Sequence, residues 1–317
     1  MKQLEADISV FQNIGRTYLK EAIIHGGSAN STIPENLFQG CSSLTSITIP
    51  SSITSIGKNA FNNCGNLDVH ADSIEHWCSI IFGAEGSNPL DHFYKPGRTK
   101  GSGLYVNGKL VTKIDKPNVT RIADRAFLGY AKLESVILDE NVERIEPYSF
   151  CRNTNLKNVT LLRDDVAIST EAFGDCSSLR TITITGKNPT FNAGDNTGAQ
   201  FTFRNVTTLE EVEAPVTIIQ KLLPNNANLT KITINTATEI PDSLLSNCKL
   251  LQELTLPFLG KNNSSSTGAY LSRLFGGKSS SDYSLIPTSL YSVTITEGKY
   301  INSQGFYHCP DLLFIEL

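Results

Sequence analysis

The sequence contains no apolar run that approaches the roughly 20 residues needed to cross a membrane as a helix. Its start, Met1 to Glu5, also lacks the apolar segment of a secretory signal, so we expect a cytosolic chain or a mature chain whose signal has been removed. An excess of basic residues is missing as well, since 27 Lys and Arg stand against 31 Asp and Glu, for a net charge of -4. Without a basic field to hold a phosphate backbone, we expect no nucleic-acid partner.

Motifs for catalysis or metal binding are also missing. The sequence has no H-E-x-x-H and no nucleophile elbow. The Gly-Gly-Lys-Ser stretch ending at Ser279 looks like the end of a phosphate-binding loop, but Ser272 stands where that loop requires a glycine. We therefore expect no cofactor. A zinc site would need side chains from a strand end and a helix to converge, and the sequence predicts none at His70, Asp72, His76 and Cys78.

What the sequence does contain is a repeat. One spacing of apolar residues, I-x-x-x-x-F-x-x-C-x-x-L-x-x-I-x-I, runs from Ile33 to Ile49 and returns at Ile56, 23 residues further on. Weaker copies are centred on Leu209, Leu229 and Leu290, and loosely on Leu19, which brings the total to about eleven. The clear copies begin at Ile33, Ile56, Ile122, Ile145, Ile168, Ile240 and Ile301.

The end of each copy predicts a strand with one buried face. In L-x-x-I-x-I the last apolar residues alternate with polar ones, so Ile47 and Ile49 should point inward while Ser46 and Thr48 point outward. Copies stacked at about 4.8 Å per strand would form a parallel sheet over a continuous core. The Ile and Phe that begin each copy would fill the opposite side of that core. Asn and Gly between them suit tight turns with unusual backbone angles.

The seven cysteines fit this repeat better than a disulfide framework, because their number is odd and most of them share one repeat position. A metal or redox ladder would need clustered spacings such as C-x-x-C, which do not occur. We therefore interpret them as small apolar side chains packed inside each turn. The cysteines at this position are Cys41, Cys64, Cys176, Cys248 and Cys309.

These repeats resemble the BspA-type leucine-rich repeats of bacterial surface proteins. The phrase AFxxCxxLxxIxIPxxxxxI occurs nearly unchanged at Ala60 and Ala172, and the similarity covers roughly residues 33–317. The resemblance implies a leucine-rich-repeat solenoid, β-rich with a parallel strand ladder and little helix, wound as a right-handed superhelix. It also implies secretion or display at the cell surface, adhesion to proteins or glycans, and no enzyme activity.

Two insertions interrupt the period within what we expect to be a single leucine-rich-repeat domain, residues 1–317. The first, residues 73–117, should hold a helix that starts at Ser73 and stops at Gly83, and then a hairpin about Asn107 and Gly108. It is similar to an insertion common in the family, where it sits in the solenoid as a structural island. The second, residues 258–284, has a Leu-Phe-Gly ending at Gly276 that matches Ile-Phe-Gly in the first, so we expect both to end a short helix alike.

The outward side of the strand ladder is the one extended surface that the repeat defines. Thr favours strands, so this face could be solvated sheet and nothing more, and the curvature of a solenoid could also make it a concave platform for a partner. Both interpretations can hold at once. Its main charged feature is the acidic patch of Glu211, Glu213 and Glu253. The residues that we predict to contact a partner are Thr183, Glu211, Glu213, Lys231, Thr233, Glu253 and Thr255.

The sequence therefore favours a non-enzymatic binding or adhesion module, extracellular or on the cell surface, that presents this concave face to a protein or glycan. The alternative is a structural spacer within a larger surface protein, because the chain stops at Leu317 inside a predicted strand without a polar cap. We expect no membrane span in this chain. An enzyme is the third and weakest alternative, which a metal bound between His70 and His92 would favour.

Overall fold

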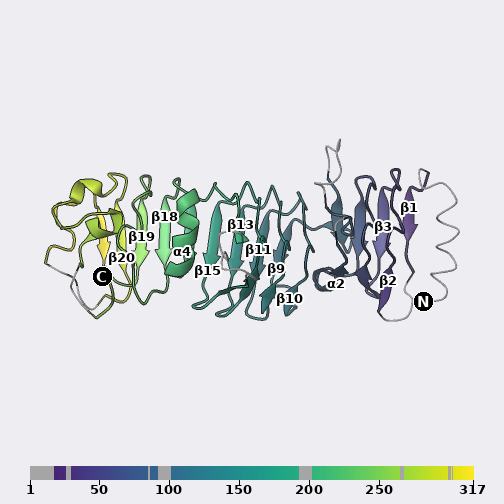
Figure 1. Cartoon of the computed structure of the whole chain (residues 1–317), viewed down its shortest axis with the longest axis horizontal. Helices are drawn as coiled ribbons and strands as arrows, with labels where there is room; N and C mark the ends of the chain where they lie inside the picture. The colour runs from purple at the N-terminus through teal and green to yellow at the C-terminus, as the bar shows by residue number, and fades with distance from the viewer. Residues whose placement is uncertain are drawn as a thin grey trace. The chain divides into compact units, whose positions relative to one another are not determined.

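The structure is a computed structural model that describes residues 18–25, 30–84, 86–91, 101–192, 202–264, 268–298, 301 and 303–317. These residues form a parallel-strand β-solenoid of about 12 turns with little helix, which confirms the predicted fold class (Figure 1). The chain divides into two compact units. The first comprises Met1–Leu156, Val166–Ser177 and Thr190–Arg204, and the second comprises Lys157–Asp165, Ser178–Pro189 and Asn205–Leu317. The single-domain organisation of residues 1–317 stays a prediction.

The first unit carries two sets of parallel strands on opposite sides of its turns. Longer strands follow the order β1-β3-β5-β7, and β8 pairs with β7 in an antiparallel hairpin. Short strands, most of which contain a repeat isoleucine, form the orders β2-β4-β6 and β10-β12-β14-β16. Strand β9 pairs with the longer strand β11. The bounds are β1 (Glu21–Ile23), β2 (Ser31–Ile33), β3 (Ser46–Ile49), β4 (Ile53–Ile56), β5 (Asp68–Ala71), β6 (Ile81–Phe82), β7 (Gly103–Val106), β8 (Lys109–Leu110), β9 (Lys113–Asp115), β10 (Arg121–Ile122), β11 (Ser135–Leu138), β12 (Arg144–Ile145), β14 (Ala167–Ser169) and β16 (Thr190–Asn192).

The second unit carries one continuous parallel ladder in the order β13-β15-β17-β18-β19-β20-β21. Figure 1 shows several of these strands side by side, from teal to yellow. Their bounds are β13 (Asn158–Leu161), β15 (Thr181–Ile184), β17 (Glu211–Ala214), β18 (Lys231–Ile234), β19 (Glu253–Leu256), β20 (Ser292–Ile295) and β21 (Phe314–Glu316).

Helices are few and short. The first unit contains α2 (Ile74–Ser79). The second unit contains α4 (Val216–Leu222) and three 3-10 helices, η1 (Leu223–Asn225), η2 (Leu271–Phe275) and η3 (Tyr283–Leu285), among the residues that the structure describes. Helix α4 precedes Leu229, the centre of a weak repeat copy, in a segment for which the sequence analysis predicted no helix. Ile218 in this helix and Leu223 after it are buried, so the segment still supplies apolar residues to the core.

The predicted alternation along the strands is confirmed in both units. In β3, β11, β15, β19 and β20 the second and fourth residues are buried and the first and third are partly exposed. The repeat isoleucines fill the other side of the core, with Ile33, Ile122 and Ile145 fully buried. Strand β21 is the exception. There Ile315 occupies a core position and is still 46% exposed, because β21 is the edge strand of the ladder among the described residues.

The turns need left-handed backbone angles, as the Asn and Gly content predicts. Asn36 and Asn59, 23 residues apart, have φ of 60° and 56°, and Asn63 has φ of 57°. Asn is among the residues that adopt this conformation at the lowest steric cost. Tyr148 and Glu171 occupy the same repeat position with φ of 57° and 53°, so the repeat imposes this angle even on residues that disfavour it.

The first insertion agrees with the prediction in part. Ser73 caps α2 by accepting a hydrogen bond from the His76 amide (3.1 Å), and Asn107 and Gly108 form the hairpin turn with φ of 51° and 71°. However, the helix ends at Ser79, because Ile81 and Phe82 form strand β6. Strands β5 and β7 pair in register over four residues, so the hairpin continues the ladder and is not a structural island.

In the second insertion, Gly276 ends helix η2 with a φ of 99°, as expected of a left-handed cap. The expectation that both insertions end a helix in the same way is therefore wrong. The Leu-Phe-Gly of the second insertion ends helix η2, whereas the Ile-Phe-Gly of the first lies at strand β6.

Candidate functional site

The predicted contact residues lie on four neighbouring strands of the second unit, β15, β17, β18 and β19. Their outward side chains, which we call the strand face, are partly exposed or exposed and stand in two rows. Neighbouring strands in such a ladder lie about 4.8 Å apart, so residues along a row are direct neighbours. The first row is Thr181, Glu211, Lys231 and Glu253, and the second row is Thr183, Glu213, Thr233 and Thr255.

One network ties two charged side chains of this face to a tyrosine outside it. The Lys231 ammonium lies 3.0 Å from Glu253 Oε2, and the Tyr291 hydroxyl donates to Glu253 Oε1 at 2.8 Å. The Tyr291 hydroxyl and Lys231 therefore hold the pKa of Glu253 below its ordinary value. In return, the Glu253 carboxylate raises the pKa of both Lys231 and Tyr291. The negative charge of Glu253 is thus already balanced within the protein by Lys231 and stabilised by the Tyr291 hydroxyl.

The remaining two carboxylates of the predicted acidic patch are in a different situation. Glu211 and Glu213 both point outward from β17, and neither forms an ion pair with a basic side chain of the described residues. Lys231 stands beside Glu211 in the ladder, but its ammonium bonds Glu253. The excess negative charge of the strand face is therefore concentrated on β17, and the acidic patch is narrower than the sequence indicates.

Tyr291, which joins this network from outside the strand face, is the residue that sequence reasoning missed. It follows Leu290 directly and precedes the strand β20, at a repeat position that elsewhere carries polar residues such as Thr230 and Gln252. An aromatic residue at a position that the repeat leaves polar was the available signal.

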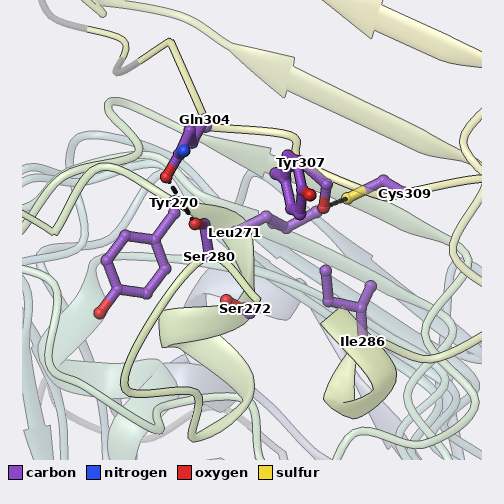
Figure 2. A pocket seen from close by; sticks show the side chains of 9 residues that line it. Tyr270, Leu271, Ser272, Ser280, Ile286, Gln304, Tyr307 and Cys309 are labelled. Atoms are coloured by element: carbon purple, nitrogen blue, oxygen red, sulfur yellow. Dashed lines mark hydrogen bonds between the residues drawn. The ribbon is translucent and has the colours of Figure 1, made fainter. Parts of the chain in front are cut away.

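The second insertion and the last turn border a shallow hollow that has no room for a bound molecule inside it (Figure 2). Across it, the Ser280 hydroxyl and Gln304 Oε1 lie 2.7 Å apart, joined by a hydrogen bond. The hollow is lined by Tyr270, Leu271, Ser272, Ser280, Ile286, Gln304, Gly305, Tyr307 and Cys309.

In the stretch that looks like a phosphate-binding loop, the backbone amides already donate hydrogen bonds to a side chain of the protein. The Asp282 carboxylate accepts hydrogen bonds from the amides of Lys278 (2.7 Å) and Ser279 (3.0 Å), and these amides hold the pKa of Asp282 below its ordinary value. A phosphate would have to displace this carboxylate and would meet its negative charge.

The residues weighed as a zinc site have separate partners. The His70 ring stacks on Tyr105 at 5.2 Å, and a ring nitrogen of His76 lies 2.6 Å from the Ile53 carbonyl. Asp72 accepts a hydrogen bond from the Ser51 amide, and Cys78 is fully buried. Over the described ranges, no group of three or more His, Cys, Asp or Glu side chains is placed to hold a metal. His92 lies outside the described residues.

The cysteines are free thiols, and six of the seven are buried. Burial raises the pKa of Cys248 to about 11 and that of Cys151 to about 12, and it raises the pKa of Cys176 further. Such thiols stay protonated near neutral pH and are poor nucleophiles. Cys309, in the last turn, is only partly buried.

A ladder of parallel strands, a core filled at a fixed period and outward polar rows define a leucine-rich-repeat solenoid. The model of the BspA type leucine rich repeat region matches six copies in this chain, over residues 9–75, 102–195 and 196–272. The chain therefore belongs to the BspA-type leucine-rich-repeat family. A comparison with curated proteins gives no match.

Three solved structures from bacteria are similar to this chain. The leucine-rich-repeat protein of Treponema pallidum is 19% identical over 54% of this chain and 71% of its own, with a TM-score of 0.34. A leucine-rich-repeat protein of Eubacterium ventriosum is 16% identical over 98% and 76%, with a TM-score of 0.35. A leucine-rich cell-surface protein of Faecalibacterium prausnitzii is 19% identical over 93% and 87%, with a TM-score of 0.27.

Family and fold are of a kind that is typically non-catalytic. As for the membrane, the helices found in the described ranges all fall short of the length and apolar content that a span requires.

Proposed function

We propose that this chain is a non-enzymatic binding module whose strand face holds a protein or glycan partner. The observation that carries the proposal is the pair Glu211 and Glu213, two outward carboxylates without a basic partner of their own in the described residues. They stand in the middle of an in-register ladder whose other outward residues are mostly Thr, Ser and Asn.

The fold itself does not need this charge. The buried residues of β17, Val212 and Ala214, supply its contribution to the core, while the outward positions face solvent. Two carboxylates on one face of one strand repel each other and lack the strand preference of Thr. Residues that cost local stability and do not help the chain to fold are expected at a recognition surface.

The charge also indicates the chemistry of the partner. A pair of outward carboxylates outside any ion pair attracts and orients a surface that bears Lys or Arg, and it disfavours an acidic one. The Thr residues of the neighbouring strands β15 and β18 offer hydroxyl groups that can donate or accept hydrogen bonds. A protein with basic side chains satisfies both features. The family resemblance supports a place on the cell surface, where such a module would meet its partner.

The test is an array of extracellular-matrix proteins and glycans probed with the intact chain. We expect at least one ligand, and we expect Glu211→Lys with Glu213→Lys to weaken its binding by about tenfold or more. The matched control is Glu143→Lys with Glu297→Lys, which makes the same charge change at exposed positions outside the strand face.

Equal binding by both double variants would show that the strand face is not the binding surface. A failure of the intact chain to bind any member of the array would contradict the binding function and favour the structural spacer.

A further inference from the structure

A second surface of the second unit departs from the repeat in a way that the fold does not explain. In the four other turns with a repeat cysteine, the two residues before it are small or polar, and most of them reach solvent. In the last turn these positions hold Tyr307 and His308, both exposed. The corresponding residues in the other turns are Gln39 and Gly40, Asn62 and Asn63, Gly174 and Asp175, and Ser246 and Asn247.

These two rings belong to a cluster that the second insertion completes. Tyr283, from η3, stacks on His308 with ring centres 4.9 Å apart, and Tyr307 meets His308 edge to face at 4.3 Å. We call Tyr283, Tyr307 and His308 the aromatic cluster. Tyr283 and Tyr307 remain 41% and 44% exposed, although their rings are packed against a neighbour. The stacking fixes the orientation of the rings, so their exposed faces are presented before any ligand arrives.

Uncharged polar groups lie beside one ring of the aromatic cluster. Tyr307 also lines the shallow hollow of Figure 2, next to Gln304 and Ser280, and none of the residues that line this hollow carries a charge. The closest acidic residue in the insertion's sequence, Asp282, is engaged by the amides of Lys278 and Ser279. Rigid ring faces beside amide and hydroxyl groups match the chemistry of a sugar, which has C–H faces and hydroxyl edges.

We propose that the aromatic cluster, with Gln304 and Ser280, is a binding site for a neutral oligosaccharide. A pyranose would lie on the exposed face of Tyr283 or Tyr307 and hydrogen bond to the polar groups beside it. A protein partner is the weaker fit, because the hot spots of protein interfaces seat a large side chain in a deep pocket, and the shallow hollow beside Tyr307 does not provide one. The site is separate from the strand face and does not rest on the function proposed for it.

The test uses the intact chain and three neutral sugars, cellohexaose, chitohexaose and maltohexaose, titrated by calorimetry. We expect at least one of them to bind, and we expect Tyr283→Ala with Tyr307→Ala to weaken that binding by about tenfold or more, through loss of both stacking faces. Tyr307→Phe keeps the ring and should bind within about threefold of the unaltered chain. Tyr18→Ala removes an exposed tyrosine of the first unit and is the matched control.

Circular dichroism of each variant verifies that the fold is retained. The proposal is overturned if none of the three sugars binds, or if the double tyrosine variant binds as well as the unaltered chain. It is also overturned if the double variant loses a protein ligand while no sugar binds. The strand-face variants Glu211→Lys and Glu213→Lys should leave sugar binding unchanged, which separates this result from the outcome for the strand face.

Discussion

At the scale of single residues, the side chain of the repeat cysteine packs as an apolar group and also donates a hydrogen bond to a backbone carbonyl. Cys64 Sγ donates to the Phe38 carbonyl at 2.9 Å, and Cys176 Sγ donates to the Phe150 carbonyl at 3.2 Å. Asn153 replaces the cysteine in one turn, and its amide nitrogen donates to the Phe127 carbonyl at 2.7 Å. Each donor adds a second hydrogen bond to a carbonyl of the preceding turn, because these carbonyls also accept from the Cys41 amide, the Asn153 side-chain amide and the Tyr130 amide.

The same burial makes six thiols unreactive and leaves one accessible. We expect iodoacetamide to add one group to the native chain, on Cys309, because the other six cysteines are buried and Cys309 is not. In urea, all seven should react. Intact-mass spectrometry and peptide mapping measure both numbers. Native labelling of Cys176 or Cys248 at the rate of Cys309 would contradict the packing of the turns.

At the scale of elements, a column of phenylalanines joins the turns of the first unit. Phe150 lies between Phe127 and Phe173, with ring centres 5.4 and 5.2 Å apart and interplanar angles of 5° and 8°. Phe203 continues the column beyond Phe173 at 5.5 Å. The spacing of the rings follows the spacing of the strands, so each ring packs against the ring of the neighbouring turn.

Removing one ring should therefore affect two interfaces. We expect Phe150→Ala to lower the free energy of unfolding by about 3–5 kcal/mol, as for other fully buried aromatic residues. Phe306→Ala is the control, because Phe306 has the same place in the repeat but is only partly buried, and it should cost less than half as much. Urea denaturation of both variants measures the difference. Equal losses would show that the column does not carry this stability.

A single buried arginine holds the second insertion in place. The Arg273 side chain, 4% exposed, donates to the carbonyls of Gly268 (2.9 Å), Ile240 (2.8 Å), Leu259 (3.1 Å) and Gly260 (2.9 Å). It also pairs with Asp242 at 2.8 Å. Its planar guanidinium reaches acceptors in several directions at once, which a lysine ammonium cannot do.

We therefore expect Arg273→Lys to loosen the second insertion by about 2–4 kcal/mol, since hydrogen bonds to a charged donor are each worth about 1.5–3 kcal/mol. Limited proteolysis should then cleave the chain between residues 258 and 284 under conditions that leave the unaltered chain intact. Arg180→Lys, at an exposed ion pair with Glu210, is the control and should have little effect. An unchanged cleavage rate in the Arg273 variant would show that Arg273 does not hold the second insertion in place.

The sequence predicted those elements whose residues interact with near neighbours or with the repeat. The strands follow from alternation at a fixed period, and the hairpin at Asn107 and the Ser73 cap follow from local chemistry. Strand β7 was harder to place, because Leu104 joins the ladder without the repeat spacing around it. The site was predicted in part. Alternation places Glu211 outward, but whether Lys231 bonds Glu211 or Glu253 depends on side-chain geometry across strands, and so does the contribution of Tyr291.

At the scale of the whole molecule, a solenoid is stabilised by contacts between successive turns, so its stability reflects many similar buried groups. Four buried thiols, Cys78, Cys151, Cys176 and Cys248, have a raised pKa in the folded chain. In the unfolded chain a thiol ionises near pH 8.5. Above that pH the unfolded state loses protons that the folded state keeps, so unfolding becomes more favourable as the pH rises.

We expect the free energy of unfolding to be steady from about pH 7 to 8 and to fall above about pH 9, by up to about 1.4 kcal/mol per pH unit for each buried thiol. Urea denaturation with reductant at pH 8, 9 and 10 measures this slope. A Cys176→Ala variant, with one fewer such thiol, should show a shallower slope. A stability that does not change up to pH 10 would mean that these thiols are not buried as described.

The central claim is that the strand face of β15, β17, β18 and β19 is the surface that meets a partner. Carboxylate labelling with carbodiimide and glycine ethyl ester, read by mass spectrometry, tests it directly with the ligand captured on the array. The account predicts that bound ligand lowers the labelling of Glu211 and Glu213 and leaves Glu143 and Glu297 unchanged. Full labelling of Glu211 and Glu213 in the saturated complex would contradict it.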